Sequence, residues 1–257
     1  MTDTILNFTR YDGPTSATPC LIAHGLFGSA RNWGAIAKRL STTRPVITVD
    51  MRNHGHSFWS ETHGYPDLAA DLARVIDELG HGPLDVIGHS MGGKAAMALA
   101  LTYPEHVARV MVADIAPVSY SHSQMQFIDA MRNVDLDKVA RRSDAADQLG
   151  TLGVEAALQS FFTQSLDIPD KRWRMNLEVL AREMPKILAF PQFDAMFESP
   201  TLFLSGANSD YVRPDYRMTI KNLFPKARFA KLPEAGHWLH AEKPREFVAT
   251  AEAFFDH

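Results

Sequence analysis

Short apolar runs recur along most of this chain, and stretches with the spacing of amphipathic helices separate them. The runs hold Val, Ile, Leu and Ala on consecutive positions, as parallel strands do when both of their faces are buried. Predicted strands cover residues 20–23, 45–49, 84–87, 110–113, 201–204 and 228–232. Helix-forming stretches lie between them, such as 95–101, which Pro104 ends, and a C-terminal helix is predicted over 243–255. The alternation predicts an α/β fold with a mostly parallel, doubly wound sheet.

Residues 121–191 interrupt this alternation. Helical patterns cover 124–133, 142–149, 154–162 and 171–184, and no run in this part has the pattern of a strand. We therefore expect a core built from residues 1–120 and 192–257, with residues 121–191 inserted as a helical cap. Its aromatic residues have spacings that favour packing, and we expect one or two of them to line a pocket as well. They are Phe127, Phe161, Phe162, Trp173 and Phe190.

A Gly-His-Ser-Met-Gly string at residues 88–92 joins the strand over 84–87 to the next helix. Such a sharp turn is typical of a catalytic serine, because it presents the hydroxyl at the top of the sheet above a helix N-terminus. We expect a strained backbone with positive φ at Ser90, and we expect Gly88 and Gly92 to allow the close approach of strand and helix. A glycine-rich turn with an incidental serine would explain the string but not its position between strand and helix.

A second loop suits the stabilisation of an oxyanion. Attack by Ser90 on a carbonyl would create a negative oxygen that needs two fixed donors. The N–H of Met91, the residue after the nucleophile, is one candidate. The other must come from the loop after the strand over 20–23, which holds Gly25 and Gly28, and we assign it to the N–H of Leu26.

A histidine base is expected near the C-terminus, on the loop that follows the strand over 228–232. His237 on this loop can reach the top of the sheet and take the proton from Ser90. His240 competes for the role, but it lies close to the next helix, so we expect it to be a surface or capping residue.

Two aspartates qualify as the acid that orients this histidine. Asp114 ends the strand over 110–113, 24 residues after Ser90. Asp210 lies in the loop after the strand over 201–204. The residues alone leave both open, and the aspartate without this role is expected to be an exposed loop carboxylate or a turn cap.

These motifs occur in the order of the α/β-hydrolase fold, which the chain resembles over nearly its whole length, most weakly between about 121 and 197. Residues 49–57 (VDMRNHGHS) and 113–118 (ADIAPV) are similar to one branch, the bacterial YbfF-type esterases and their mitochondrial ABHD11-like relatives. Many α/β-hydrolases carry the acid three residues after the glycine of the later strand, and that position here is Ser209, one residue before Asp210. The resemblance to this branch implies Asp114 as the acid and the hydrolysis of short acyl esters or thioesters.

Other polar residues have simpler interpretations. His54 and His56 form an H-x-H pair that could chelate a metal, but no third ligand occurs at a recognisable spacing, so structural or solvated roles are favoured. Ser90 and Lys94 are four residues apart, not three as in S-x-x-K enzymes. No nucleotide-binding glycine motif is present, so we expect neither a metal nor a cofactor.

Composition and net charge limit the partners and the cellular compartment that we expect for this protein. The 257 residues are 46% hydrophobic, and 30 acidic against 26 basic residues give a net charge of −4. Because the chain has no basic cluster, we expect neither nucleic acid nor an anionic membrane as a partner. A single cysteine, Cys20, suits a reducing compartment. The N-terminus lacks the basic segment of a signal peptide, and no apolar run reaches membrane-spanning length, so we expect a cytoplasmic protein with no membrane insertion. The sequence gives no indication of the oligomeric state.

The combined prediction is a serine hydrolase that cleaves short-chain carboxylic esters through an acyl-enzyme, with acyl thioesters as a second substrate class. The same three residues would also serve an acyltransferase or a perhydrolase, in which an alcohol or peroxide intercepts the acyl-enzyme. A non-catalytic small-molecule binding protein is the least favoured reading, because a nucleophile, a base and a suitable acid are all present.

Overall fold

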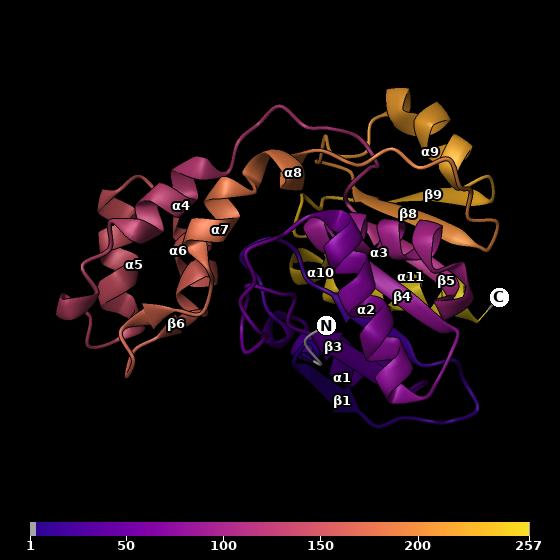
Figure 1. The fold of residues 1–257 in the computed structure, drawn as a ribbon, viewed down its shortest axis with the longest axis horizontal. Coiled ribbons are helices and arrows are strands. Elements are labelled where there is room, and N and C mark those ends of the chain that lie inside the picture. Colours follow the sequence, from indigo (N-terminus) through magenta and orange to yellow (C-terminus); the bar gives the residue numbers. More distant parts are fainter. Residues whose placement is uncertain (1–3, 257) are drawn as a thin grey trace.

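A twisted sheet of mostly parallel strands runs through the larger part of the molecule (Figure 1). The computed structural model describes residues 4–256. The strands of this sheet are β1 (Phe8–Tyr11), β2 (Cys20–Ala23), β3 (Val46–Val49), β4 (Leu84–His89), β5 (Val107–Ala113), β8 (Thr201–Gly206) and β9 (Ala227–Leu232). Within the described residues, these seven strands have the order β1-β3-β2-β4-β5-β8-β9. Only β1 runs antiparallel to its neighbour in this sheet.

All six predicted strands are present, and the α/β fold with a mostly parallel sheet is confirmed. The sequence analysis missed β1. This strand pairs with β3 at the edge of the sheet, and its FTRY sequence is partly exposed, so it lacks the apolar run that marks the buried strands.

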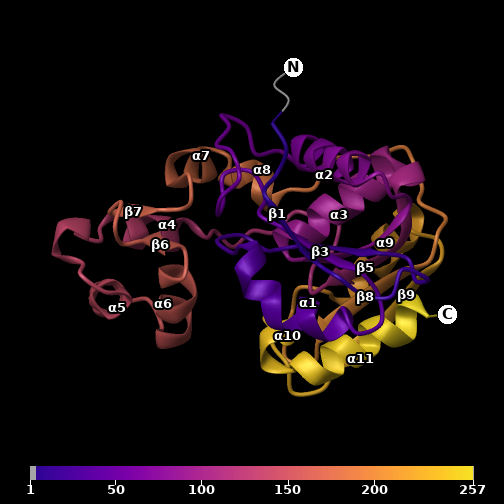
Figure 2. The ribbon, with the colours of Figure 1, turned by 90° about the horizontal axis from the view of Figure 1, so that it is seen from below.

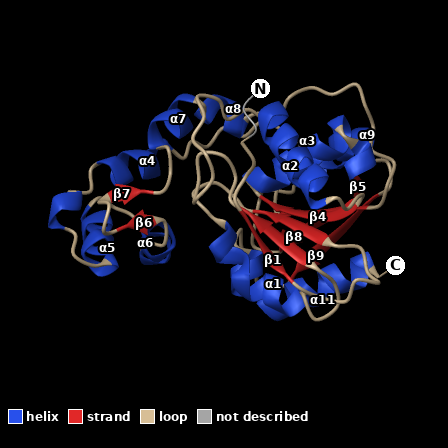
Figure 3. Ribbon diagram, turned by 60° about the horizontal axis from the view of Figure 1, so that its bottom comes forward, coloured by secondary structure: helices blue, strands red, loops and turns tan. Residues whose placement is uncertain are grey.

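Helices cover both faces of the sheet (Figure 3). One face carries α2 (Tyr65–Leu79), α3 (Met91–Thr102) and α9 (Arg217–Leu223), and the other carries α1 (Gly34–Leu40) and α11 (Pro244–Phe255). The shorter helical elements of the core are η1 (Ala30–Trp33), η2 (Pro104–His106), η4 (Pro214–Tyr216) and α10 (Leu239–Glu242). Each face buries its own apolar cluster, which explains why the central strands read as continuous hydrophobic runs.

The chain between β5 and β8 forms a separate lobe beside one end of the sheet (Figure 2). It contains α4 (Met125–Arg132), η3 (Leu136–Lys138), α5 (Arg142–Thr151), α6 (Ala156–Thr163), β6 (Leu166–Asp167), β7 (Arg172–Trp173), α7 (Leu177–Arg182) and α8 (Met184–Leu188). The expectation that this region has no strand was wrong, because β6 and β7 pair as a small antiparallel hairpin. Two-residue strands are too short to produce a periodic pattern in the sequence.

Parallel strands bring their carboxyl ends to one edge of the sheet. Ser90 follows β4 there, and Asp114 follows β5. The loop after β9 carries His237 to the same edge. Within residues 4–256, every helix is too short or too polar to span a lipid bilayer. The expectation that the chain has no signal peptide depends partly on residues 1–3. These residues lie outside the described part of the structure.

Candidate active site

Ser90 occupies the turn between β4 and α3 with φ 52° and ψ −120°, which confirms the expected positive φ. A non-glycine residue holds such a conformation only where its surroundings fix it, and these strained positions cluster at functional sites. The flanking glycines permit the turn. A Cβ on Gly88 would lie 2.3 Å from the Gly92 carbonyl oxygen, and one on Gly92 would lie 2.3 Å from that of Ala23.

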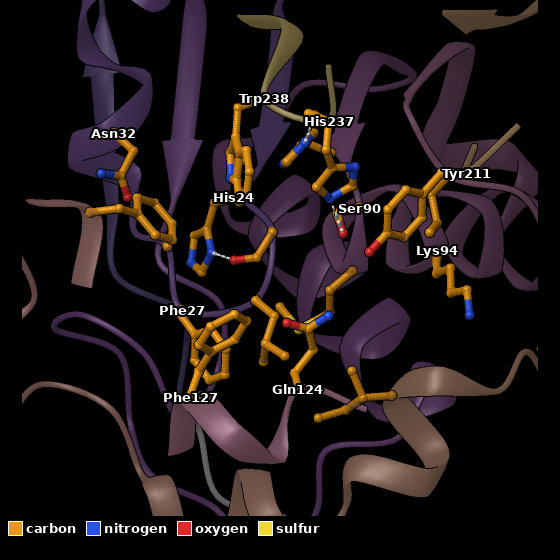
Figure 4. A pocket seen from close by; sticks show the side chains of 18 of the residues that line it. His24, Phe27, Asn32, Ser90, Lys94, Gln124, Phe127, Tyr211, His237 and Trp238 are labelled. Carbon is orange, nitrogen blue, oxygen red and sulfur yellow. Dashed lines mark hydrogen bonds between the residues drawn. The ribbon is translucent and has the colours of Figure 1, made fainter. Parts of the chain in front are cut away.

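The tertiary structure brings Ser90, His237 and Asp114 into one series of hydrogen bonds. Ser90 Oγ lies 3.1 Å from His237 Nε2, and His237 Nδ1 lies 2.7 Å from Asp114 Oδ2 (Figure 4 shows the first two side chains). Because a carboxylate only accepts, Nδ1 carries the proton and Nε2 is free to accept from the serine hydroxyl. The Asp114 side chain is fully buried and that of His237 is 16% exposed.

Asp114 is held in place by the loop that follows β8. The Gly206 N–H donates to its Oδ1 at 3.0 Å, and Ser209 Oγ donates to its Oδ2 at 2.5 Å. Asp114 also has a positive φ, 53°, directly after β5. Asp210 is exposed on the same loop. The geometry therefore joins Asp114 to His237. Ser209 stands at the position where many α/β-hydrolases carry their acid, and here it donates to the Asp114 carboxylate.

Two neighbours fix the His237 ring and backbone, and the sequence analysis identified neither. The Tyr211 ring stacks on His237 with centroids 4.1 Å apart and an interplanar angle of 21°. His89 Nε2–H donates to the His237 carbonyl oxygen at 2.8 Å, and burial lowers the pKa of His89 well below its usual range, which keeps the ring neutral. His89 could have been noticed as the residue before the serine, whereas no sequence signal marks Tyr211.

The expectation for His240 was wrong. Its side chain is buried against the sheet and stacks on Trp33, with centroids 4.1 Å apart and nearly parallel rings. The short helix α10 turns this residue inward, and burial lowers its pKa to about 3.

The loop expected to supply an oxyanion donor lies beside the Ser90 turn. Met91 is the first residue of α3, so its N–H has no acceptor within the helix. Among the described residues, the Leu26 N–H has no hydrogen-bond acceptor either, and Leu26 lines the same cavity as Ser90. Both groups are therefore free to donate to a ligand at this point.

Two buried histidines hold this loop. His24 Nδ1–H donates to the Gly25 carbonyl at 2.7 Å, and its Nε2 accepts from the Met51 N–H at 3.0 Å. His54 Nε2 accepts from the N–H of Phe27, a residue with φ 65°, at 3.3 Å, and its Nδ1–H donates to the Arg52 carbonyl at 3.0 Å.

Burial keeps both rings in the neutral form that these bonds require. It lowers the pKa of His24, and it lowers that of His54 to about 3. Of the H-x-H pair, only His54 is buried. His56 is exposed, and its Nε2 contacts Arg174 at 2.6 Å, so the two rings of the pair serve different parts of the structure.

Ser90 opens onto a cavity of about 310 Å³ with a mainly hydrocarbon lining. Three of the aromatic residues between 121 and 191, Phe127, Phe161 and Phe162, line it, one more than the one or two expected. Phe27, from the loop after β2, lines it as well (Figure 4 labels Phe27 and Phe127). Trp173 instead packs inside the lobe, where its indole N–H donates to the Met131 carbonyl at 2.9 Å.

Lys94 also borders this cavity, but its amine is not directed to the serine. Lys94 Nζ donates to the carbonyls of Leu188 and Ala189 at 2.8 Å each, which fastens α3 to the chain leaving α8. Burial lowers the pKa of this lysine to about 7. A Ser–Lys pairing is therefore not formed here.

Several known proteins are similar to this chain in sequence or in structure. A sequence profile described as "alpha/beta hydrolase fold" matches residues 18–244. The chain is 40% identical to "sn-1-specific diacylglycerol lipase ABHD11" of Mus musculus over 97% of this chain and 84% of the relative. It is 38% identical to "Esterase YbfF" of Escherichia coli strain K12 over 88% of this chain and 89% of that one. A solved structure titled "Marine microorganism esterase" superposes with a TM-score of 0.92 at 32% identity, covering 98% of this chain and 100% of the other.

Proposed function

Because this chain belongs to the α/β-hydrolase family, as a carboxylic ester hydrolase of the YbfF and ABHD11 type, we propose that it cleaves esters of short acyl chains through Ser90, His237 and Asp114. The proposal rests on one series of hydrogen bonds, from Ser90 Oγ to His237 Nε2 and from His237 Nδ1 to the buried carboxylate of Asp114. This series lies at the mouth of an apolar cavity suited to an acyl chain.

In the first half-reaction, Ser90 Oγ attacks the ester carbonyl while its proton passes to His237 Nε2. The N–H groups of Met91 and Leu26 stabilise the resulting oxyanion. Asp114 accepts from Nδ1–H and stabilises the imidazolium. The imidazolium then gives its proton to the alkoxide, which leaves as the alcohol, and the acyl group remains on Ser90.

In the second half-reaction, water takes the place of the alcohol. His237 Nε2 removes a proton from the water as its oxygen attacks the acyl carbonyl. Collapse of the oxyanion breaks the bond to Ser90 Oγ, which receives the proton back from His237. The products are a carboxylic acid and the free enzyme.

The cavity supports the preference for short acyl chains. Its volume of about 310 Å³ is close to the lower end of small-molecule sites, and aromatic rings from residues 121–191 line it. The proposal includes the division into core (1–120 and 192–257) and cap (121–191), because residues of the cap line the cavity beside Ser90. Acyl thioesters offer the same carbonyl to Ser90 and form the second substrate class.

A panel of p-nitrophenyl esters from acetyl to palmitoyl tests the proposal. The wild type should hydrolyse the butyryl ester faster than the palmitoyl ester. Ser90→Ala should remain folded and lose at least ~10³-fold of this activity, the scale of losing a triad residue. A fluorophosphonate probe should label the wild type and Ser143→Ala, an exposed serine of α5, but not Ser90→Ala. Labelling that persists in Ser90→Ala, or faster turnover of palmitate, would contradict the proposal.

A further inference from the structure

The His237 ring has an aromatic neighbour on its face, and ester hydrolysis gives that contact a second role besides holding the ring. Tyr211 lies in the loop after β8, and its ring stacks on the imidazole with centroids 4.1 Å apart and an interplanar angle of 21°. The two rings therefore meet nearly face to face (Figure 4 shows both side chains). The face of an aromatic ring carries negative charge, so the phenol presents this charge to the group that takes up the proton.

Contacts on several sides hold the Tyr211 ring in this position. Its hydroxyl is hydrogen-bonded to His122 Nε2 at 2.6 Å, and its carbonyl accepts from the Tyr120 hydroxyl at 2.6 Å. The rings of Tyr120 and His122 pack against it, with centroids 5.2 and 5.1 Å away. The Tyr211 N–H donates to Ser209 Oγ at 3.3 Å, and that serine hydroxyl donates to Asp114. The loop after β8 therefore fixes the aromatic ring and the carboxylate together.

Four titratable side chains around the His237 ring are neutral near pH 7. Burial lowers the pKa of His89 well below its usual range and that of His240 to about 3. It also lowers the pKa of His122, and it raises that of Tyr211 to about 12, so the phenol does not ionise near pH 7. The charge of a protonated His237 is therefore not opposed by a second cation on these histidines.

Two groups in direct contact with this ring can stabilise a positive charge on it. Asp114 contacts the edge of the imidazole at Nδ1, and Tyr211 covers its face. Asp210 and Arg213 border the hollow beside the ring, but their charges have opposite signs. A cation over an aromatic face is attracted by the negative charge of the π system, and the attraction grows where water is excluded. The His237 side chain is only 16% exposed, so this condition is largely met.

We propose that the Tyr211 ring stabilises the imidazolium form of His237, which arises each time the base takes a proton from Ser90 or from water. This inference rests on the proposed function. The ring attracts the charged base more strongly than the neutral one, and only interactions that strengthen toward the transition state lower the barrier. Tyr211 exchanges no proton itself and acts through His237 in both half-reactions.

Loss of this attraction should have two separate effects on the pH profile. A less stable imidazolium raises the barrier, so the plateau of kcat should fall by about threefold. The base of the free enzyme also releases its proton at lower pH, so the acid limb of kcat/KM should move down by about half a pH unit. KM should change little where the shape of the ring is kept. A ring that only holds His237 in place would lower the plateau and leave the acid limb unmoved.

An exchange that keeps the shape of the ring isolates the electrostatic effect. Tyr211→Phe keeps an aromatic face and should stay within about twofold of the wild type, with an unmoved acid limb. A second variant carries 3,4,5-trifluorophenylalanine at this position, which withdraws electrons from the face, so it should show both effects relative to Tyr211→Phe. Neither variant has the hydroxyl that contacts His122, so the loss of that contact is common to both. The profiles come from p-nitrophenyl butyrate hydrolysis between pH 5 and 9, with circular dichroism at each pH to verify folding.

Two leucine variants complete the comparison. Tyr211→Leu removes the aromatic face and should show both effects at least as strongly as the fluorinated ring. Tyr216→Leu is the matched control, because the Tyr216 ring packs on Tyr120 instead, and its plateau and acid limb should equal those of the wild type. Equal profiles for the phenyl and trifluorophenyl enzymes, or a lower plateau with an unmoved acid limb, would overturn the inference while ester hydrolysis itself remains. Absence of hydrolysis in the wild type would instead refute the proposed function.

Discussion

At the scale of single residues, the site depends on backbone strain as much as on side-chain chemistry. Ser90 and Asp114 both have positive φ immediately after a strand, with values of 52° and 53°. Each side chain is thereby turned out of the strand direction and toward His237. The two strained residues directly follow the adjacent parallel strands β4 and β5, so one sheet edge sets the relative position of the serine and the carboxylate.

The contacts of Asp114 lead to a prediction that separates it from Asp210. Asp114→Asn should keep the fold but favour the wrong tautomer of His237, and an analogous triad change lowers kcat by roughly 10⁴-fold. Asp210→Asn removes an exposed loop charge and should cost less than about tenfold. The measurement is kcat for both variants, with circular dichroism to verify folding. A nearly silent Asp114→Asn beside an inactive Asp210→Asn would reverse the assignment.

Ser209 contacts the same carboxylate. Its hydroxyl donates to Asp114 Oδ2, the same oxygen that faces His237 Nδ1. The loop after β8 therefore contributes a donor where many α/β-hydrolases place the acid itself. The carboxylate and the loop hydroxyl cooperate across β5 and β8, which are neighbours in the sheet.

At the scale of elements, the conformation of the loop between β2 and η1 depends on contacts with a second loop, which follows β3. His54 comes from that second loop, and its Nε2 accepts from the Phe27 N–H next to Leu26. The rings of His24 and His54 also meet edge to face, with centroids 5.1 Å apart. The position of the proposed oxyanion donor is thus set by residues far from Ser90 in the sequence.

This arrangement predicts that His54→Ala lowers kcat by about 10²-fold with little change in KM, because small displacements of catalytic groups can have effects of that size. His54→Gln, which offers an amide oxygen to the Phe27 N–H, should recover part of the loss. His56→Ala, an exposed neighbour, should retain nearly full activity. Steady-state kinetics of the three variants test this prediction. A kcat for His54→Ala close to that of the wild type would contradict the positioning role assigned to His54.

At the scale of the whole molecule, five histidines of the described residues are buried in neutral form. Burial is the main cause of a lowered pKa at each of them, and for His54 and His240 the value falls to about 3. The members of this group are His24, His54, His63, His89 and His240. In the unfolded chain each would titrate near 6.5.

The shifts predict loss of stability in weak acid. As pH falls through 6.5, the unfolded chain binds protons at these histidines while the folded chain does not, so the free energy of unfolding decreases with falling pH. Each fully buried ring contributes a slope that approaches about 1.4 kcal/mol per pH unit between 6.5 and its folded pKa. Urea denaturation at pH 7, 6 and 5 measures the slope.

His240→Phe is the matched variant for this measurement. A phenyl ring can keep the stack on Trp33, and His240 Nδ1 is buried without a hydrogen-bond partner among the described residues, so no bond at that atom is lost. The variant should have a shallower pH slope than the wild type by about one histidine's contribution. A wild-type stability that stays flat between pH 7 and 5, or an unchanged slope in His240→Phe, would contradict the role assigned to burial.

Local pattern by itself determined the α/β fold, six strands and the turn that holds Ser90, because buried parallel strands and a strand-turn-helix junction require particular residues at neighbouring positions. The family resemblance added the choice of Asp114 over Asp210. Tertiary structure decided what depends on distant segments: the exposed edge strand β1, the β6–β7 hairpin, and the inward position of His240. It also decided the stacking of Tyr211 on His237 and the contact of His54 with the loop before η1. These contacts join residues that are far apart in the chain, and no local periodicity records them, because their free energy is gained only when the sheet has brought the loops together.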